Sequence, residues 1–93
     1  MPTSPSTAIQ AVRYYISHLD LPYEIHYGKP TRRTRKSRSL YIEFYRVPIT
    51  FRDVDGTILG VNLFVDSQTG SLRTGAYFRP TRELLIAAMD ERK

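Results

Sequence analysis

Six lysine or arginine side chains fall within the twelve residues from Gly28 to Ser39, and no acidic residue separates them. The six are Lys29, Arg32, Arg33, Arg35, Lys36 and Arg38. A cluster of this kind binds phosphate groups by releasing condensed counterions, and the attraction does not depend on base sequence. Guanidinium groups add bidentate contacts to phosphate oxygens and can stack on bases. The segment therefore predicts a site for a polyanion, and nucleic acid is the favoured class.

Tyrosine side chains on the predicted sheet could add base stacking to this site. Tyr41 and Tyr45 lie on one predicted strand and Tyr77 on a later one, and we expect all three on the outer face of the sheet. Exposed aromatic rings on a sheet stack unpaired bases. The alternative is that tyrosine pairs across neighbouring strands only stabilise the sheet. The candidate contacts beyond the basic segment are Tyr41, Tyr45, Tyr77, Arg46, Arg52 and Arg73.

The same outer face could be covered by a second copy of the chain. Ile58 and Phe64 alternate onto the side opposite to Leu59, Val61 and Leu63. Apolar side chains on both faces of a strand indicate that both faces are covered. A homodimer interface on the outer face is therefore a second hypothesis for this surface.

A catalytic site is less well supported by the residue pattern. His18 and His26 are the only histidines, and a ribonuclease would need His26 and Glu43 in one cleft for general acid–base chemistry. Asp53 and Asp55 start like a calcium loop, but Phe64 stands where such a loop needs a bidentate glutamate. We therefore expect no metal site and no cofactor, and the pattern does not favour an enzyme.

These residues must be positioned by elements that the hydrophobic pattern predicts. Residues 1–5 are expected to form a disordered tail before a single domain at 6–93, although Ser4 could also cap a helix with Pro5 at its first position. Ile9, Val12 and Ile16 then fall on one face of that helix. A second helix is expected from about Pro80, with an apolar stripe made by Leu84, Leu85, Ala88 and Met89.

Strands are predicted between the two helices. Alternation indicates strands at 23–27 and from residue 40 onward, and Pro48 is expected to interrupt or end the second of these. Hairpin turns are predicted at Asp53–Thr57, which contains Asp-Gly, and at Asp66–Gly70. The strands around these turns make residues 40–78 an antiparallel meander, and the basic segment at 28–39 is expected to be a loop. The fold class is therefore α+β, a two-layer domain with a sheet of three to five strands and both helices on one sheet face.

Composition limits the classes of protein that the chain can represent. The chain has 93 residues and a formal net charge of +5, from 14 basic and nine acidic residues. It has no cysteine, which excludes disulfides and thiolate chemistry. No run approaches the roughly 18 apolar residues of a membrane span, and the first residues do not resemble a secretory signal. We expect a cytoplasmic protein that is not secreted.

Two functional hypotheses follow. The leading one is a small nucleic-acid-binding module, for DNA or RNA, whose arginine-rich loop contacts phosphates. The second is a protein-interaction module, such as an inhibitor or adaptor of a phage or mobile element, whose basic loop docks on an acidic partner surface. A small ribonuclease ranks third.

Overall fold

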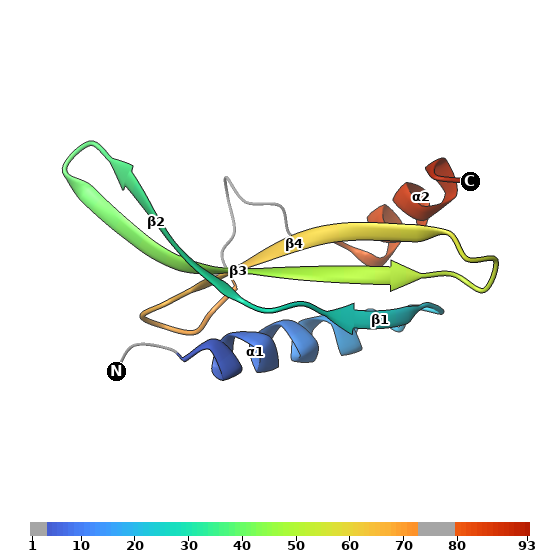
Figure 1. Cartoon of the computed structure of the whole chain (residues 1–93), viewed down its shortest axis with the longest axis horizontal. Helices are drawn as coiled ribbons and strands as arrows, with labels where there is room; N and C mark the ends of the chain where they lie inside the picture. Colours follow the sequence, from blue (N-terminus) through green and yellow to red (C-terminus); the bar gives the residue numbers. More distant parts are fainter. Residues whose placement is uncertain (1–3, 73–79) are drawn as a thin grey trace.

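The computed structural model describes residues 4–72 and 80–93, and in these the fold is α+β, as the sequence predicts. An N-terminal helix is followed by four strands of one antiparallel sheet and a C-terminal helix (Figure 1). The elements are α1 (Pro5–Ser17), β1 (Glu24–Tyr27), β2 (Thr31–Ser37), β3 (Leu40–Arg52), β4 (Ile58–Asp66) and α2 (Arg82–Glu91).

The long strand β3 is the centre of the sheet. β4 pairs with one edge of β3, from Phe44 opposite Asp66 to Arg52 opposite Ile58. The other edge of β3 is shared by two strands, because β1 pairs with residues 49–52 and β2 with residues 40–46. The predicted strand at 23–27 therefore joins the sheet as β1.

Local sequence signals explain where each helix begins. The Ser4 hydroxyl accepts a hydrogen bond from the Thr7 amide at 3.2 Å, and Pro5 occupies the first helical turn, where it gives up no hydrogen bond. The helix therefore begins at Pro5, inside the range predicted as a tail. Thr81 caps α2 in the same way, accepting from the Leu84 amide at 3.2 Å, so Pro80 precedes that helix.

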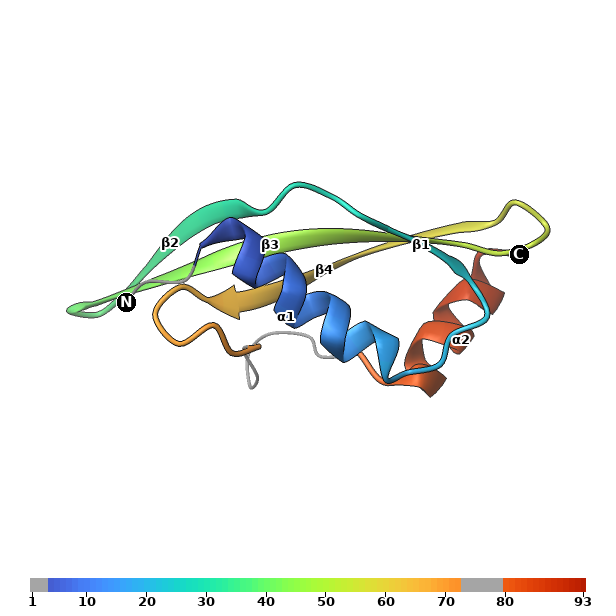
Figure 2. The same cartoon turned by 90° about the horizontal axis from the view of Figure 1, so that it is seen from below.

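Both helices cover the same face of the sheet (Figure 2). Ala8, Val12 and Ile16 of α1 are buried, and so are Leu85 and Met89 of α2. The central residues of each predicted apolar stripe are therefore buried, as expected. Ile9 is only half-buried and Leu84 is 49% exposed, because each lies at the margin of its helix face.

Odd-numbered residues of β3 form the side of the sheet that faces the helices. The register places them opposite apolar residues of β4, and the cross-strand pairs are Tyr45–Val65, Val47–Leu63, Ile49–Val61 and Phe51–Leu59. All of these except the half-buried Val61 belong to the buried core cluster, together with Ala8, Val12, Ile16, Leu85 and Met89. The even-numbered residues of β3 face the other side, which we call the helix-free face.

Pro48 does not end the strand, and that prediction is wrong. The carbonyl of Pro48 accepts the Gly28 amide at 2.7 Å, so the backbone of Pro48 points toward the β1 and β2 edge. That edge lies where β1 has ended and β2 has not begun. Proline is tolerated here because the donor it lacks would face a gap between two partner strands rather than a continuous ladder.

Both predicted turns are present. Gly56 has φ of 89° in the turn at 53–57, and Gly70 has φ of 75° in the turn at 66–70. These are backbone conformations that glycine adopts without steric cost. Leu72 forms an isolated bridge with Val65, but most of the strand predicted at 72–78 lies outside the described residues.

Candidate nucleic-acid interface

The basic segment is a strand rather than the loop that the sequence predicts. β2 pairs with the first half of β3 through seven residue pairs, from Thr31 opposite Arg46 to Ser37 opposite Leu40. We call the hairpin of residues 31–46 the hairpin arm. Alternation along a strand sends successive side chains to opposite faces, so neighbouring cations are separated and their repulsion is reduced. The seven backbone pairs with β3 then hold the segment extended.

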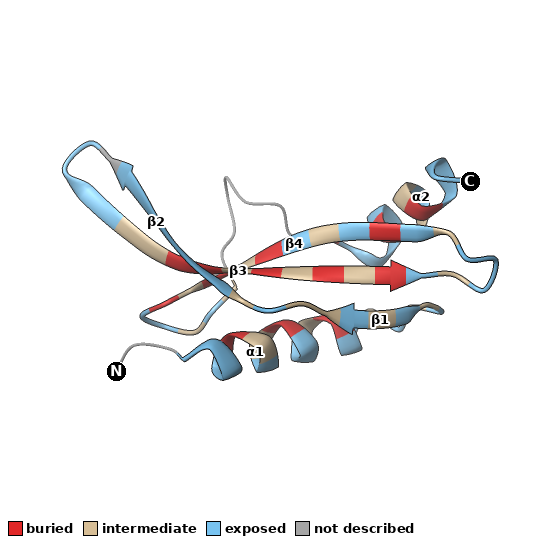
Figure 3. Cartoon of the chain, viewed as in Figure 1, coloured by how far each residue is buried: buried red, intermediate tan, exposed pale blue. Residues whose placement is uncertain are grey.

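The hairpin arm extends away from the helices, at the end of the sheet far from α2 (Figure 1). Residues 38–41 at its tip are exposed, whereas burial is concentrated in the part of the sheet that the helices cover (Figure 3). The molecule measures 46 × 26 × 19 Å. β4 begins to pair only at Phe44, so residues 34–43 form a ribbon of two strands in the described structure.

One face of the arm carries cations that already have partners within the arm. Nη2 of Arg32 donates to Oε2 of Glu43 at 2.6 Å, and this hydrogen bond raises the pKa of Arg32. Nζ of Lys36 lies 5.6 Å from the ring centroid of Tyr41, within reach of a cation–π interaction. These contacts join β2 to β3 across the face that continues into the helix-covered side of the sheet.

The helix-free face of the arm carries cations that are open to solvent. Arg33 and Arg35 are exposed and have no ion pair or hydrogen bond among the described side chains. The register sets Arg33 opposite Phe44 and Arg35 opposite Ile42. Leu40 lies on the same face and is 68% exposed. This face therefore combines two free guanidinium groups with an apolar strip.

The exposure of Leu40 and Ile42 differs from the sequence expectation. Placing Tyr41 and Tyr45 on the outer face puts the residues that alternate with them, Leu40 and Ile42, on the inner face. Leu40 and Ile42 differ from the buried residues of β3 in their distance along the strand from the part that the helices cover. Leu40 is exposed and Ile42 half-buried, while Phe44 on the same face is buried. The first residues of β3 therefore act as surface, although their alternation is that of a half-buried strand.

The other predicted contact residues are spread more widely. Lys29 is exposed in the segment between β1 and β2, and Arg46 is half-buried on the helix-free face near the root of the arm. Nε of Arg46 is buried and has no hydrogen-bond partner among the described atoms. Arg52 is exposed on the same face, but six residues further along β3, about 20 Å away. Arg73 and Tyr77 lie outside the described residues.

Tyr45 does not lie on the outer face, and its prediction as a stacking residue is wrong. Its side chain is 6% exposed and belongs to the core cluster with Ala8, Val12 and Ile16. Tyr41 lies on the same side of β3 but four residues nearer the tip, and it is 68% exposed. Both tyrosines are therefore on the helix-covered side of the sheet, and only Tyr41 extends past the core.

The charge of the protein is concentrated in the arm and the residues that lead into it. The segment 28–39 holds six of the fourteen basic residues and none of the nine acidic ones. The rest of the chain therefore has eight basic and nine acidic residues, and is close to neutral. The excess positive charge of the chain is carried by one exposed strand with its flanking turn and linker.

His26 and Glu43 do not come together, so the pair that a ribonuclease would require is not formed. His26 lies opposite Thr50 on the helix-free face, whereas Glu43 is on the opposite face and seven residues away along β3. Nε2 of His26 lies 3.1 Å from Oε1 of Glu24 instead, as their alternation suggests. Among residues 4–72 and 80–93, no group of three histidine, aspartate or glutamate side chains could hold a metal ion.

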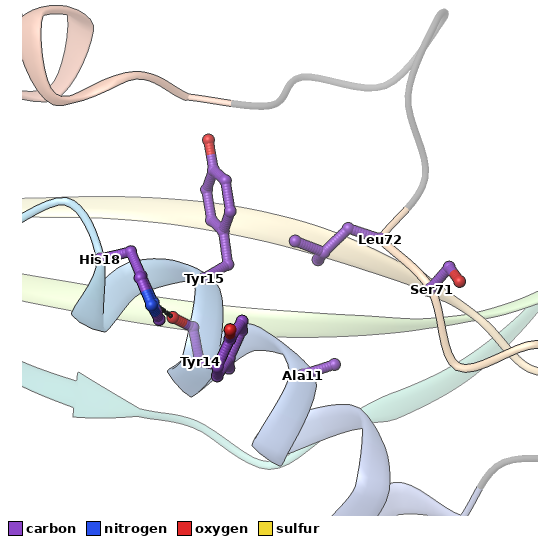
Figure 4. A pocket seen from close by; sticks show the side chains of 6 residues that line it. All are labelled: Ala11, Tyr14, Tyr15, His18, Ser71 and Leu72. Atoms are coloured by element: carbon purple, nitrogen blue, oxygen red, sulfur yellow. Dashed lines mark hydrogen bonds between the residues drawn. The ribbon is translucent and has the colours of Figure 1, made fainter.

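A pocket of about 400 Å³ lies between α1 and the chain that follows β4 (Figure 4). Its described lining is Ala11, Tyr14, Tyr15, His18, Ser71 and Leu72. Nδ1 of His18 lies 2.7 Å from the Tyr14 carbonyl oxygen, and the two rings pack with centroids 4.4 Å apart. None of the described lining residues is a carboxylate that could act with this histidine. The pocket thus presents an apolar surface rather than an acid–base pair.

The far end of the sheet is joined to α2 by an ion-pair cluster. Nζ of Lys93 lies 2.6 Å from Oδ2 of Asp53 and 3.6 Å from Oδ2 of Asp55. The hydrogen bond from Lys93 lowers the pKa of Asp53, and the same bond raises the pKa of Lys93. This cluster positions the end of α2 against the β3–β4 turn, on the opposite end of the sheet from the arm.

Comparison of the chain with protein-family models, with curated proteins and with solved structures finds no match. Within the described parts of the chain, neither helix is long and apolar enough to cross a membrane.

Proposed function

We propose that the protein is a nucleic-acid-binding module, not an enzyme, and that the cations of the hairpin arm contact phosphate groups. One observation carries the proposal: the excess positive charge of the chain lies on and beside one exposed strand, while the remainder is nearly neutral. Surface charge that serves only solubility has no reason to gather on a single protruding element. A polyanion gives that arrangement a physical role.

The arm is also held in shape before any ligand binds. The Arg32–Glu43 ion pair and the Lys36–Tyr41 contact join its two strands. A preordered site loses less conformational entropy on binding than a flexible loop would. The arm thereby presents its phosphate contacts at fixed spacing.

A salt-dependent titration tests the proposal. Short fluorescent duplex DNA, double-stranded RNA and single-stranded DNA are titrated with the protein, and the dissociation constant is measured from about 50 mM to about 200 mM salt. If all six cations contact phosphates, the logarithm of the binding constant falls against the logarithm of salt with a slope of about −5.

A matched pair of variants assigns that slope to the arm. The double variant Arg33→Ala with Arg35→Ala should bring the slope closer to zero by about 2, because two cations that displace counterions from the nucleic acid are lost. The double variant Arg13→Ala with Arg92→Ala removes the same charge outside the arm and should leave the slope unchanged. Equal losses in both variants, or equally weak binding to heparin and every nucleic acid, would contradict the proposal.

A second candidate function is binding of an acidic protein segment, and the edge of β2 favours it. Within the described residues β2 pairs only with β3, so its other edge presents free backbone groups. An extended acidic peptide could add to such an edge as a further strand. This function predicts a tight protein complex with no salt-dependent binding to nucleic acid.

A homodimer through the helix-free face would show as a mass of two chains in sedimentation.

A further inference from the structure

We infer that the hairpin arm enters the major groove of B-form DNA with its helix-free face toward the base edges. The inference rests on the proposed function and goes further, because it names the form of nucleic acid, the groove and the face of the arm that reads it.

The width of the arm points to this groove. Residues 34–43 form a ribbon of only two strands in the described structure, and this ribbon extends away from both helices (Figure 1). The major groove of B-form DNA is about 12 Å wide and admits a two-stranded ribbon, whereas the minor groove is about 6 Å wide. The major groove of A-form RNA is deep and too narrow for side chains to read. The ribbon therefore fits the major groove of B-form DNA without deformation of the duplex, whereas the minor groove would have to be widened.

The chemistry of the helix-free face fits the base edges in that groove. Arg33 and Arg35 are exposed and unpaired among the described side chains, so each retains its full set of donors. Two donors of one guanidinium match O6 and N7 of guanine, which lie in the major groove. Leu40 and Ile42 lie beside these arginines and can contact the methyl group of thymine.

The opposite face of the ribbon is unsuited to this role. It carries Glu43, a carboxylate whose charge is repelled by the phosphates that line the groove. Glu43 is also bound to Arg32, so that guanidinium is already engaged. If this face is turned away from the bases, the long side chains of Lys36 and of Arg38 in the turn can still reach the phosphates at the edge of the groove. The position of Glu43 and the donors of Arg33 and Arg35 therefore both favour the helix-free face as the one that contacts the bases.

Methylation by dimethyl sulfate tests the groove directly, because the reagent modifies guanine N7 in the major groove and adenine N3 in the minor groove. The full chain is bound to duplex DNA of mixed sequence, and protection of both positions is mapped. We expect protection of guanine N7 and none of adenine N3. Protection of adenine N3 alone, or of neither position while the protein is bound, overturns the inference and leaves phosphate binding intact.

Two further comparisons separate this inference from the proposed function. The double variant Arg33→Lys with Arg35→Lys keeps the charge but loses the bidentate fork. It should keep the salt slope, lose the guanine protection and bind a protected site about 5- to 150-fold more weakly. An unchanged footprint in this variant contradicts the inference. Binding of A-form RNA as tightly as DNA also overturns it, and absence of binding to any nucleic acid overturns both proposals.

The apolar strip has its own matched control. Leu40→Ala should weaken binding to thymine-containing duplexes more than to the same duplexes with uracil in place of thymine, since uracil lacks the methyl group. Val54→Ala changes another exposed apolar side chain, 97% exposed at the β3–β4 turn, and should have no effect on either duplex. Equal weakening of both duplexes by Leu40→Ala would mean that Leu40 does not contact the thymine methyl.

Discussion

Gly28 packs directly on Pro48 at the point where the chain leaves β1 and enters the hairpin arm. Its amide donates to the Pro48 carbonyl at 2.7 Å, and a Cβ on Gly28 would lie 2.6 Å from Cγ of Pro48. No side chain larger than hydrogen fits this crossing without movement of the proline ring or the backbone. The contact lets two strands share one edge of β3, with a bend between them that directs the arm.

Replacing Gly28 with alanine should therefore destabilise the protein. The added methyl group overlaps Pro48, and overpacking of this kind costs about 1–3 kcal/mol. Urea denaturation of both proteins measures the difference in the free energy of unfolding.

Gly60→Ala is the matched control for that variant. Gly60 is exposed on β4, and a Cβ there meets no atom within 4 Å. The variant should be neutral or slightly stabilising, because alanine loses less backbone entropy than glycine on folding. If the two variants have the same stability, the crossing is not close-packed.

The turn at the tip of the arm is held in a costly conformation. Arg38 has φ of 56°, in the left-handed region that glycine adopts more readily than other residues. We expect Arg38→Gly to strengthen the β2–β3 pairing relative to Arg38→Ala by about 1 kcal/mol, about fivefold in amide exchange protection. Both variants remove the same charge, so the comparison isolates the backbone. Slower exchange in the alanine variant would contradict the expectation.

Tyr41 and Tyr45 should differ in how much each contributes to the free energy of unfolding. Tyr45→Ala leaves a cavity in the core and should lower the free energy of unfolding by about 3–5 kcal/mol. Tyr41→Ala removes an exposed ring that contacts Lys36, and should change stability by less than about 1 kcal/mol. Urea denaturation measures both. A large loss of stability in Tyr41→Ala would show that the arm belongs to the cooperative core.

The Lys93–Asp53 pair predicts a dependence of stability on pH. The pKa of Asp53 is held below its ordinary value of 3.8, so its contribution is present above that pH and is lost as the pH falls through the lowered pKa. The pKa of Lys93 is raised above 10.5, so its contribution is lost only as the pH rises past that value. The pair therefore stabilises the fold across the whole interval between these limits.

Lys93→Met should lower the melting temperature at neutral pH, and the difference from the unchanged protein should shrink in strong acid. Thermal unfolding followed by circular dichroism at several pH values measures this. Asp90→Asn is the control, because Asp90 lies 4.0 Å from Lys93 and contributes less. A constant difference at every pH would mean that the salt bridge is not what Lys93 supplies.

The two helices and both glycine turns follow from local signals. Ser4 with Pro5 and Thr81 before Arg82 mark helix starts that need no tertiary information, and Gly56 and Gly70 stand where the turns need positive φ. These features depend on a few adjacent residues. Helix caps and glycine turns can be predicted from the sequence because the residues that cause them are adjacent in the chain.

The face of β3 was harder to predict, and Pro48 is the reason. If the strand is expected to stop there, Leu40, Ile42 and Phe44 are its apolar face and Tyr45 is outside. If it continues, Tyr45 joins Val47, Ile49 and Phe51 in one unbroken row, and this is the buried row. Continuation is possible because Pro48 lies between the part of β3 that pairs with β2 and the part that pairs with β1. That information is non-local.

The arm illustrates the same limit. Six cations within twelve residues indicate mutual repulsion and therefore a loop, because the segment itself does not show which strand it pairs with. Thr31 and Thr34 are β-branched and favour a strand weakly. The decisive interactions are the pairing of β2 with β3 and the contact of Arg32 with Glu43, eleven residues further along the chain.

The central claim is that the hairpin arm binds nucleic acid, and backbone amide shifts in a nitrogen-15-labelled sample test it most directly. Titration with duplex DNA should shift amides from Thr31 to Glu43, and leave α2 and the turn at 53–57 unchanged. The shifts should reverse on addition of salt. Shifts centred on α2 or on the pocket beside His18, with an unperturbed arm, would contradict the account.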